Sequence, residues 1–234
     1  MVEKARDRVA KMFNDLAGVY DLGNHTLSFG LDFLWRKRLA DELGKFKPET
    51  VLDLACGTMD LAITVKKQNP GAMIVGVDLA EKMLELGAKK IRAKGLEGDL
   101  FLSQADIEQM PFGDCSFAAA SIAFGIRNVE HRGEALLEIR RVLRKDGVLA
   151  VLEFSVPEKG AFAAIYRVYL GTILPLVGKI LSGGKSYFYL RDTIAQFPAP
   201  DAFCAELRSA GFAESRSISL SGGAVRIYLA QRAK

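Results

Sequence analysis

Apolar and polar positions along the chain follow two patterns. Short apolar runs, typical of strands buried in a sheet, occur at residues 50–54, 73–77, 99–104, 118–123 and 148–152, and again near 213–219 and 224–231. Longer segments carry apolar residues at helical spacing, at 2–16, 31–43, 59–68, 81–94, 130–144 and 201–210. The basic and glycine residues at 145–147 are expected to end the helix at 130–144. Strands that alternate with helices predict an α/β fold around a parallel sheet.

The turn after the first strand, at residues 55–60, limits the class of ligand that the site can bind. It contains one glycine, Gly57, whereas a dinucleotide site needs three, and the chain has no phosphate-binding P-loop. Asp78 ends the second strand 25 residues after Asp53, where an acidic residue would bind ribose hydroxyls. An adenosine ligand without a pyrophosphate fits both observations.

The composition limits the possible domain organisation, binding partners and cellular compartment of the protein. Half of the 234 residues are hydrophobic, which is enough for one large domain with its own core. A formal net charge of +4 favours contact with an anionic membrane surface but does not support nucleic-acid binding. Three widely spaced cysteines predict reduced thiols in a cytoplasmic protein, and two histidines argue against a metal site. The N-terminus lacks the apolar region of a secretory signal.

The run at residues 52–58, followed by 76–78, resembles class I methyltransferases, which use S-adenosylmethionine. The resemblance implies a Rossmann-like seven-stranded, mostly parallel sheet with helices on both faces. It also implies that the glycine turn lies under the methionine part of the cofactor and that the second-strand acid holds the ribose. The cofactor residues expected here are Asp53, Gly57, Thr58, Asp78 and Leu79. Met59 stands where such enzymes often have a second glycine, and we expect it to narrow the pocket.

Five motifs in order narrow the resemblance further. They lie at residues 20–30, 124–129, 152–157, 187–190 and 194–198. Together they resemble the ubiquinone/menaquinone biosynthesis C-methyltransferases from about residue 10 to the C-terminus. This implies methylation of demethylmenaquinol to menaquinol, or of the ubiquinone-pathway benzoquinol, with S-adenosylmethionine as the methyl donor. The chain departs from the family at Gly23 (often Met), at Ala123 (often Ser) and at Asp106-Ile107 (often Asn-Ala).

Three further positions are assigned to the cofactor by the resemblance. Asp106 would accept a hydrogen bond from the exocyclic amine of adenine, and Ile107 would cover one face of the ring. A strand-end turn with an exposed aspartate is the plainer interpretation of the same residues. Ala123 ends the fourth strand beside the cofactor, without the hydroxyl that many family members carry there.

The acceptor chemistry suggests catalytic candidates. A quinol ring carbon becomes nucleophilic when its hydroxyl loses a proton, so we expect Arg127 to stabilise the developing phenolate and Asn128 to orient the ring. Tyr20 and His25 are candidates for the base, with Asp106 (through water) and His131 as alternatives.

We expect one methyltransferase domain at 1–234, with an N-terminal helical cap at 1–47 and a helical insertion at 158–200 that contributes to the acceptor site. The apolar stretch at 161–181 contains charged residues, a proline and glycines, which argues against a membrane span. We expect helices over the sheet that form a channel for a prenyl tail or rest on a membrane surface, while ordinary helix core accounts for most of these side chains. The expected partner is a prenylated quinol, with a peripheral contact at the inner face of the membrane and a homodimer left open. Two alternatives also stay open: a methyltransferase for another lipid, such as a phospholipid amine or sterol, and a non-catalytic scaffold of a quinone-synthesis assembly.

Overall fold

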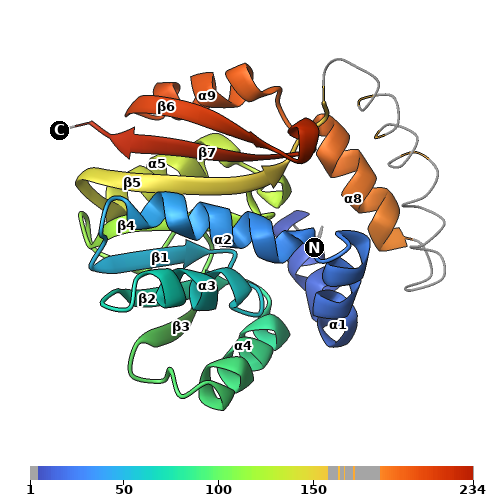
Figure 1. Ribbon diagram of the computed structural model, residues 1–234, viewed down its shortest axis with the longest axis horizontal. Helices are drawn as coiled ribbons and strands as arrows, with labels where there is room; N and C mark the ends of the chain where they lie inside the picture. Colours follow the sequence, from blue (N-terminus) through green and yellow to red (C-terminus); the bar gives the residue numbers. More distant parts are fainter. Residues whose placement is uncertain (1–4, 158–162, 164–165, 167–170, 172–184, 234) are drawn as a thin grey trace.

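A seven-stranded sheet forms the centre of the computed structural model, which describes residues 5–157, 163, 166, 171 and 185–233 (Figure 1). The strands are β1 (Thr50–Leu54), β2 (Met73–Asp78), β3 (Leu100–Gln104), β4 (Phe117–Ala123), β5 (Leu143–Phe154), β6 (Phe212–Leu220) and β7 (Val225–Arg232). Their order is β3-β2-β1-β4-β5-β7-β6. Neighbours among the first five are parallel, whereas β7 runs antiparallel to both β5 and β6. The predicted seven-stranded, mostly parallel sheet is confirmed.

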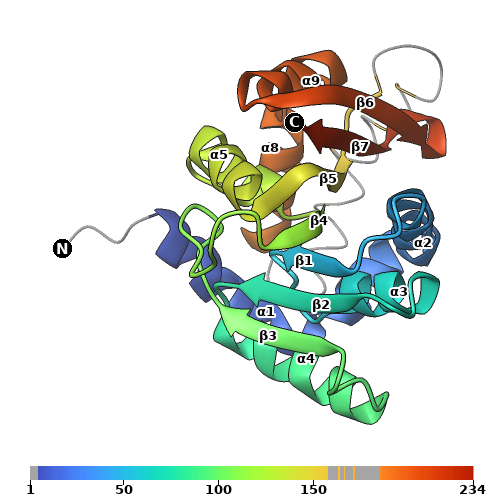
Figure 2. The same cartoon turned by 90° about the vertical axis from the view of Figure 1, so that its left-hand side faces the viewer.

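Helices cover both faces of this sheet, as predicted (Figure 2). On one face lie α2 (Leu31–Gly44), α3 (Asp60–Gln68) and α4 (Glu81–Ala93), and on the other lie α5 (Arg132–Val142) and α9 (Pro200–Ser209). Each face buries its own apolar cluster, one including Leu39, Leu43 and Val65 and the other including Leu136, Ile139 and Phe203. The central strands β1, β4, β5 and β7 are buried on both sides over most of their length, which explains their continuous apolar runs.

Two further helices lie together at one end of the sheet (Figure 1). They are α1 (Ala5–Leu27) and α8 (Lys185–Gln196). The stripe at 2–16 predicted only the first half of α1, because the segment after it contains Gly18 and Gly23. The helix nevertheless continues to Leu27, since its Asp21 side chain is bonded to α4 and to the turn after β1. One helix therefore carries both Tyr20 and Asn24.

The helix predicted at 130–144 is shorter than expected. It ends at Val142, and Leu143 already pairs with Phe117 in the sheet. The pairing then jumps to Val148 opposite Ala119, so residues 144–147 bulge out of β5 and do not cap a helix. Asp146 has a φ of 61° in this bulge, and a Cβ on Gly147 would lie 2.8 Å from a backbone oxygen. The glycine is therefore required by the bulge.

The predicted insertion is described only in part. Helix α8 covers residues 185–196, whereas the apolar stretch at 161–181 lies outside the described residues apart from 163, 166 and 171. None of the helices in the described part of the chain combines the length and the hydrophobicity needed to cross a bilayer. Two short 3₁₀ turns complete the fold, η1 (Ile126–Asn128) after β4 and η3 (Ser221–Gly223) before β7.

Candidate active site

A small cavity of about 100 Å³ lies at the carboxyl ends of the parallel strands. A recess of about 30 Å³ adjoins it and shares Gly57, Ala55 and Ala123 with it. All eight residues that the sequence assigned to the cofactor line one or the other: Asp53, Gly57, Thr58, Asp78, Leu79, Asp106, Ile107 and Ala123. Open α/β sheets bind their ligands at this edge. The fold thus brings the predicted cofactor residues together.

The glycine turn is fixed by the acid of the second strand. Gly57 has a φ of 52°, a conformation that side chains rarely adopt, and its N–H donates to Asp78 Oδ2 at 2.8 Å. The other carboxylate oxygen accepts from the Ala80 N–H at 2.8 Å. Asp78 lines the small cavity and at the same time holds the backbone of the turn against β2.

The prediction for Met59 was wrong. Its φ of 71° explains why a glycine suits this position, but the side chain is fully buried and lines neither the small cavity nor the recess. It packs where Gly76 and Gly87 leave room, since a Cβ on Gly76 would lie 2.4 Å from the Met59 sulfur. The methionine therefore fills the core beneath the turn and does not narrow the pocket.

Asp53 is the most unusual carboxyl group of the site. It is 1% exposed, and its Oδ1 accepts from the Ser121 hydroxyl at 2.6 Å. Among the described residues, its buried Oδ2 has no hydrogen-bond partner within 3.5 Å, and the Ala62 N–H is the backbone group that stabilises the carboxylate. Burial raises the pKa of Asp53 to about 7. A buried carboxylate oxygen without a hydrogen-bond partner fits a cationic ligand, and S-adenosylmethionine carries two positive charges.

Thr58 has a second task besides lining the recess. Its hydroxyl donates to Asp21 Oδ1 at 2.7 Å and accepts from Lys90 at 2.8 Å. Lys90 also forms ion pairs with Asp21 and with Asp60. This network ties α1, α3 and α4 to the glycine turn. It fixes the half of α1 that carries Tyr20.

The N-terminal half of α1 covers the small cavity from above. Arg6, Val9 and Phe13 line it, and Arg6 donates to Asp106 Oδ2 at 2.8 Å. The other Asp106 oxygen accepts from the backbone N–H of Glu108 at 2.9 Å. Asp106 is therefore held at the cavity wall and is not the exposed turn residue of the plainer interpretation.

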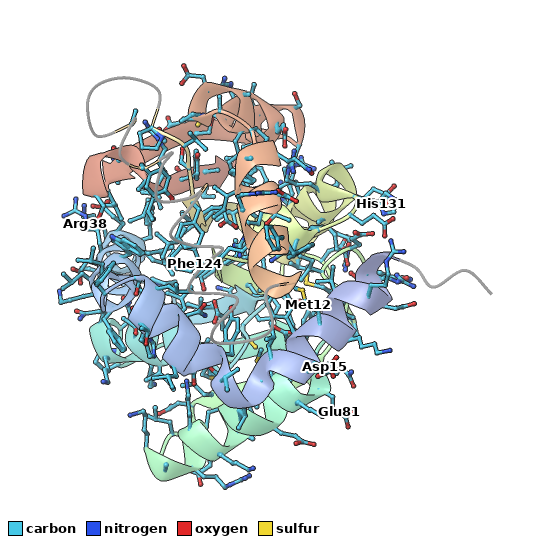
Figure 3. The ribbon with its side chains drawn as sticks, turned by 90° about the vertical axis from the view of Figure 1, so that its right-hand side faces the viewer. Met12, Asp15, Arg38, Glu81, Phe124 and His131 are labelled. Atoms are coloured by element: carbon cyan, nitrogen blue, oxygen red, sulfur yellow. The ribbon has the colours of Figure 1, made fainter. Side chains whose placement is uncertain are left out.

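A larger, apolar cavity of about 370 Å³ lies between α1, α2 and α8. Figure 3 looks onto α1 and α8, with Met12 and Phe124 near the middle of the view. The polar side chains in its wall include Tyr20, Asn24, Arg36, Arg127 and Tyr189. Phe13, Tyr20 and Phe124 line both the large cavity and the small one. They form the partition between the two spaces.

The neighbouring residues Arg127 and Asn128 face different cavities. Arg127 is nearly buried in the wall of the large cavity, where its Nη1 donates to Glu153 Oε1 at 2.8 Å and to the Phe124 carbonyl. Asn128 lines the small cavity, and its Nδ2 donates to the same carbonyl at 3.4 Å. Among the described residues, the buried Asn128 Oδ1 has no partner. The short turn η1 therefore places a cation beside one space and an unused acceptor beside the other.

Of the candidate bases, only Tyr20 and Asp106 line a cavity. Burial raises the pKa of Tyr20, which is hydrogen-bonded to Asn24. His25 lines none of the three spaces: its Nδ1 lies 2.7 Å from Asp32 Oδ2, and its ring stacks on Phe33. His131 is exposed and bonded to Glu108, and Glu134 completes a surface group that could hold a metal ion.

Sequence reasoning missed the buried pair of Arg36 and Asp32 in the wall of the large cavity. Their spacing of four residues on a helix was the available signal, but such pairs usually lie on a solvated face. The sequence motifs drew attention to Tyr189 without giving it a role, and it also lines this cavity.

Comparison with known proteins shows the family of the chain. The sequence matches the ubiE/COQ5 methyltransferase family over residues 1–232. The chain belongs to this family. The demethylmenaquinone methyltransferase of Thermus thermophilus is 43% identical over 94% of this chain and 100% of its own. The ubiquinone/menaquinone biosynthesis C-methyltransferase UbiE of Geotalea uraniireducens is 36% identical over 97% of both chains.

A solved structure supports the methyltransferase fold. A SAM-dependent methyltransferase from Thermotoga maritima superposes with a TM-score of 0.67 at 19% identity, over 95% of this chain and 98% of its own. At this identity the likeness shows the fold alone. Membership of the family makes this chain an S-adenosylmethionine-dependent methyltransferase. The small cavity and the recess are the places in the fold whose residues fit that cofactor.

Proposed function

We propose that this methyltransferase methylates a ring carbon of a prenylated quinol, with demethylmenaquinol as the leading substrate. The observation that carries the proposal is the pair of cavities that share Tyr20 and Phe124. One is lined by the predicted cofactor residues, and the other is apolar with a buried guanidinium in its wall. A flat, apolar acceptor with an ionisable oxygen fits the second space. The names of the Thermus thermophilus and Geotalea uraniireducens relatives support the same substrate class.

S-adenosylmethionine supplies an electrophilic methyl group, whose bond to sulfur breaks as the ring carbon bonds to it. The chain's own task is to align the acceptor and to exclude water. Tyr20 and Phe124 lie in the wall that the two spaces share, so the acceptor and the cofactor bind on either side of it. The apolar wall of the large cavity keeps bulk water away from the reacting carbon.

Arg127 stabilises the charge that develops on the acceptor. Its guanidinium is paired with Glu153, which is fully buried, so the side chain is fixed before the acceptor binds. A guanidinium held in a site with little water favours the phenolate form of a quinol hydroxyl and so raises the nucleophilicity of the adjacent ring carbon. Asn128 faces the small cavity and orients the bound cofactor, a change from the ring-orienting role expected from the sequence.

Tyr20 acts as a wall and a hydrogen-bond donor in this proposal, because its raised pKa keeps the hydroxyl protonated at neutral pH. His25 has a structural role, because it is one of the groups that hold Asp32 in the wall of the large cavity. Neither residue takes the part of the base: the hydroxyl proton passes to solvent when the phenolate forms, and the ring carbon loses its proton to solvent after it has accepted the methyl group, which restores the aromatic ring.

The prenyl tail leaves the large cavity toward a membrane surface. Six exposed apolar residues lie at the end of α1, in the turn that follows and at the start of α2, and we take them as one apolar patch: Val19, Leu22, Phe29, Leu31, Phe33 and Leu34. Phe29 is 83% exposed, and it lines the large cavity together with Val19 and Leu31. The mouth of an apolar cavity thus continues into an exposed apolar patch, which suits a bilayer from which a prenylated substrate enters.

Flotation with vesicles that contain anionic phospholipid tests this contact. Replacing both Phe29 and Phe33 with serine should reduce the vesicle-bound fraction several-fold, whereas Phe101→Ser, on the exposed side of β3, should not change it. Equal binding by both variants would exclude the patch as the contact. A dimer by light scattering that the Phe29/Phe33 variant abolishes would show that a second copy of the chain covers the patch.

The enzymatic proposal is tested by replacing Arg127. Arg127→Ala should lower kcat by about 100-fold or more, as the loss of one oxyanion-stabilising donor does in other enzymes. Cofactor affinity, measured by calorimetry, should stay within about twofold of the wild type, and Arg144→Ala, at an exposed site, should leave both values unchanged. An equal loss of cofactor binding would contradict the role given to Arg127. Competition with a phospholipid amine and a sterol then distinguishes the other lipid acceptors.

A further inference from the structure

The wall of the large cavity contains a pair of aromatic rings, each with a guanidinium near it. The rings of Phe124 and Phe154 have centroids 4.6 Å apart and are tilted by 33°. The Arg36 guanidinium carbon lies 5.9 Å from the centroid of Phe124, and that of Arg127 lies 5.5 Å from the centroid of Phe154. All four side chains line the cavity. A flat aromatic ligand can pack against such a pair of rings with a cation near each ring.

Arg36 is fixed from beneath, as Arg127 is. It is 7% exposed, and its Nη1 donates to the carboxylate of Asp32, itself 2% exposed. Asp32 also accepts from the Ser28 hydroxyl at 2.7 Å and lies 2.7 Å from His25 Nδ1. These bonds hold the pKa of Asp32 below its usual value against the effect of burial, so the carboxylate stays ionised beside Arg36.

The guanidinium of Arg36 has donors to spare. Within the described part of the chain, its hydrogen bonding is limited to the bond from Nη1 to Asp32. A guanidinium has five N–H donors, and donors in a nearly buried group ordinarily find acceptors. Arg36 also lines the recess beside the cofactor residues, so it lies close to the partition that contains Tyr20 and Phe124.

We propose that Arg36 holds the second oxygen of a para-dihydroxy aromatic acceptor, while Arg127 holds the oxygen beside the reacting carbon. The inference rests on the proposed function and adds a specificity-determining residue to it. Two oxygens on one ring match two nearly buried guanidiniums in the wall of one cavity, one near each ring of the aromatic pair. An acceptor with a single oxygen leaves the donors of Arg36 unpaired, and sites built to bond a hydroxyl discriminate strongly against analogues that lack it.

The test crosses one substitution with one change in the acceptor. The first acceptor is a reduced short-tailed demethylmenaquinone, and the second is the same ring and tail with only the hydroxyl beside the reacting carbon. Wild-type kcat/KM should be about 10- to 100-fold lower for the mono-hydroxy acceptor, as expected for one charge-assisted hydrogen bond. Arg36→Gln should lower kcat/KM for the dihydroxy acceptor by a similar factor and leave that for the mono-hydroxy acceptor within about twofold.

Two companion variants guard against a folding effect. Arg38→Gln, at an exposed site on the same helix, should leave kcat/KM unchanged for both acceptors. Arg36→Gln combined with Asp32→Asn keeps the buried pair uncharged and should show the same dependence on the acceptor. If Arg36→Gln and the combined variant lower kcat/KM for both acceptors equally, Arg36 has only a structural role and the inference fails. If the wild type methylates neither acceptor, the proposed function itself fails, which is a different result.

Discussion

The pKa of Asp53 leads to a prediction about cofactor binding. Its buried Oδ2 has no hydrogen-bond partner within the described residues, and burial raises the pKa to about 7. If the cofactor's positive charge meets this carboxylate, binding requires the ionised form. Protonation of Asp53 then competes with the cofactor, and the affinity rises with pH until the carboxyl group is fully ionised.

The size of the effect follows from the pKa. With a pKa of about 7, roughly 9% of Asp53 is ionised at pH 6 and roughly 76% at pH 7.5. Cofactor affinity should therefore rise about eightfold between these two pH values. The α-amino group of the cofactor titrates with a pKa of about 7.7–8.0, so a higher upper pH would mix two titrations. Asp53→Asn should bind about 10- to 100-fold more weakly at pH 7.5, because it lacks the charge.

Calorimetric titration with S-adenosylmethionine at pH 6 and at pH 7.5 measures this. The ratio of wild-type to Asp53→Asn affinity isolates the carboxyl group, because the ligand's own titration is common to both. A ratio that does not change with pH would refute the reasoning. The same pKa shift also makes the free energy of unfolding depend on pH. The folded state holds a proton that the unfolded chain releases, so the stability falls as pH rises from the ordinary carboxyl pKa of 3.8 to about 7 and then levels off. Asp53→Asn should lose that dependence and remain folded.

Three further predictions concern the core and the small cavity. Gly76→Ala places a Cβ 2.4 Å from the Met59 sulfur and should cost about 1–3 kcal/mol in urea unfolding; Gly71→Ala meets open space, and an equal loss there would contradict the packing argument. Trp35→Phe removes the 2.9 Å hydrogen bond from the indole N–H to the Ser221 hydroxyl and should lower the free energy of unfolding by about 1 kcal/mol in the same assay. An unchanged urea midpoint would show that this bond contributes nothing to stability. Asp106→Ala should weaken cofactor binding about tenfold by calorimetry, and unchanged affinity would remove Asp106 from the adenine site.

Much of the fold and of the cofactor site could be predicted from the sequence. Apolar runs of strand length alternate with helical stripes, and parallel strands bring their carboxyl ends to one edge. Asp53 in β1 pairs with Gly76 in β2, so the residues that follow these two strands must lie side by side. Residues at strand ends were therefore placed well, including Asp78, Gly57 and Ile107.

The acceptor side was harder, because helices packed at the end of the sheet form it. The spacing of Asp32 and Arg36 has the appearance of a solvated ion pair, and only the packing of α1 against α2 shows that it is buried. His25 is suitable chemically as a base, but its position on α1 turns it toward Asp32. The bulge at residues 144–147 depends on sheet register, which local propensity does not encode.

The measurement that tests the proposed function most directly is transfer of a labelled methyl group from S-adenosylmethionine to a short-tailed demethylmenaquinone, with and without reductant. Labelled product only in the reduced sample is the predicted result, because the quinol and not the quinone can form the phenolate that Arg127 stabilises. Equal product in both samples would contradict the phenolate mechanism. No product in either sample, together with clear cofactor binding, would contradict the quinol as the acceptor.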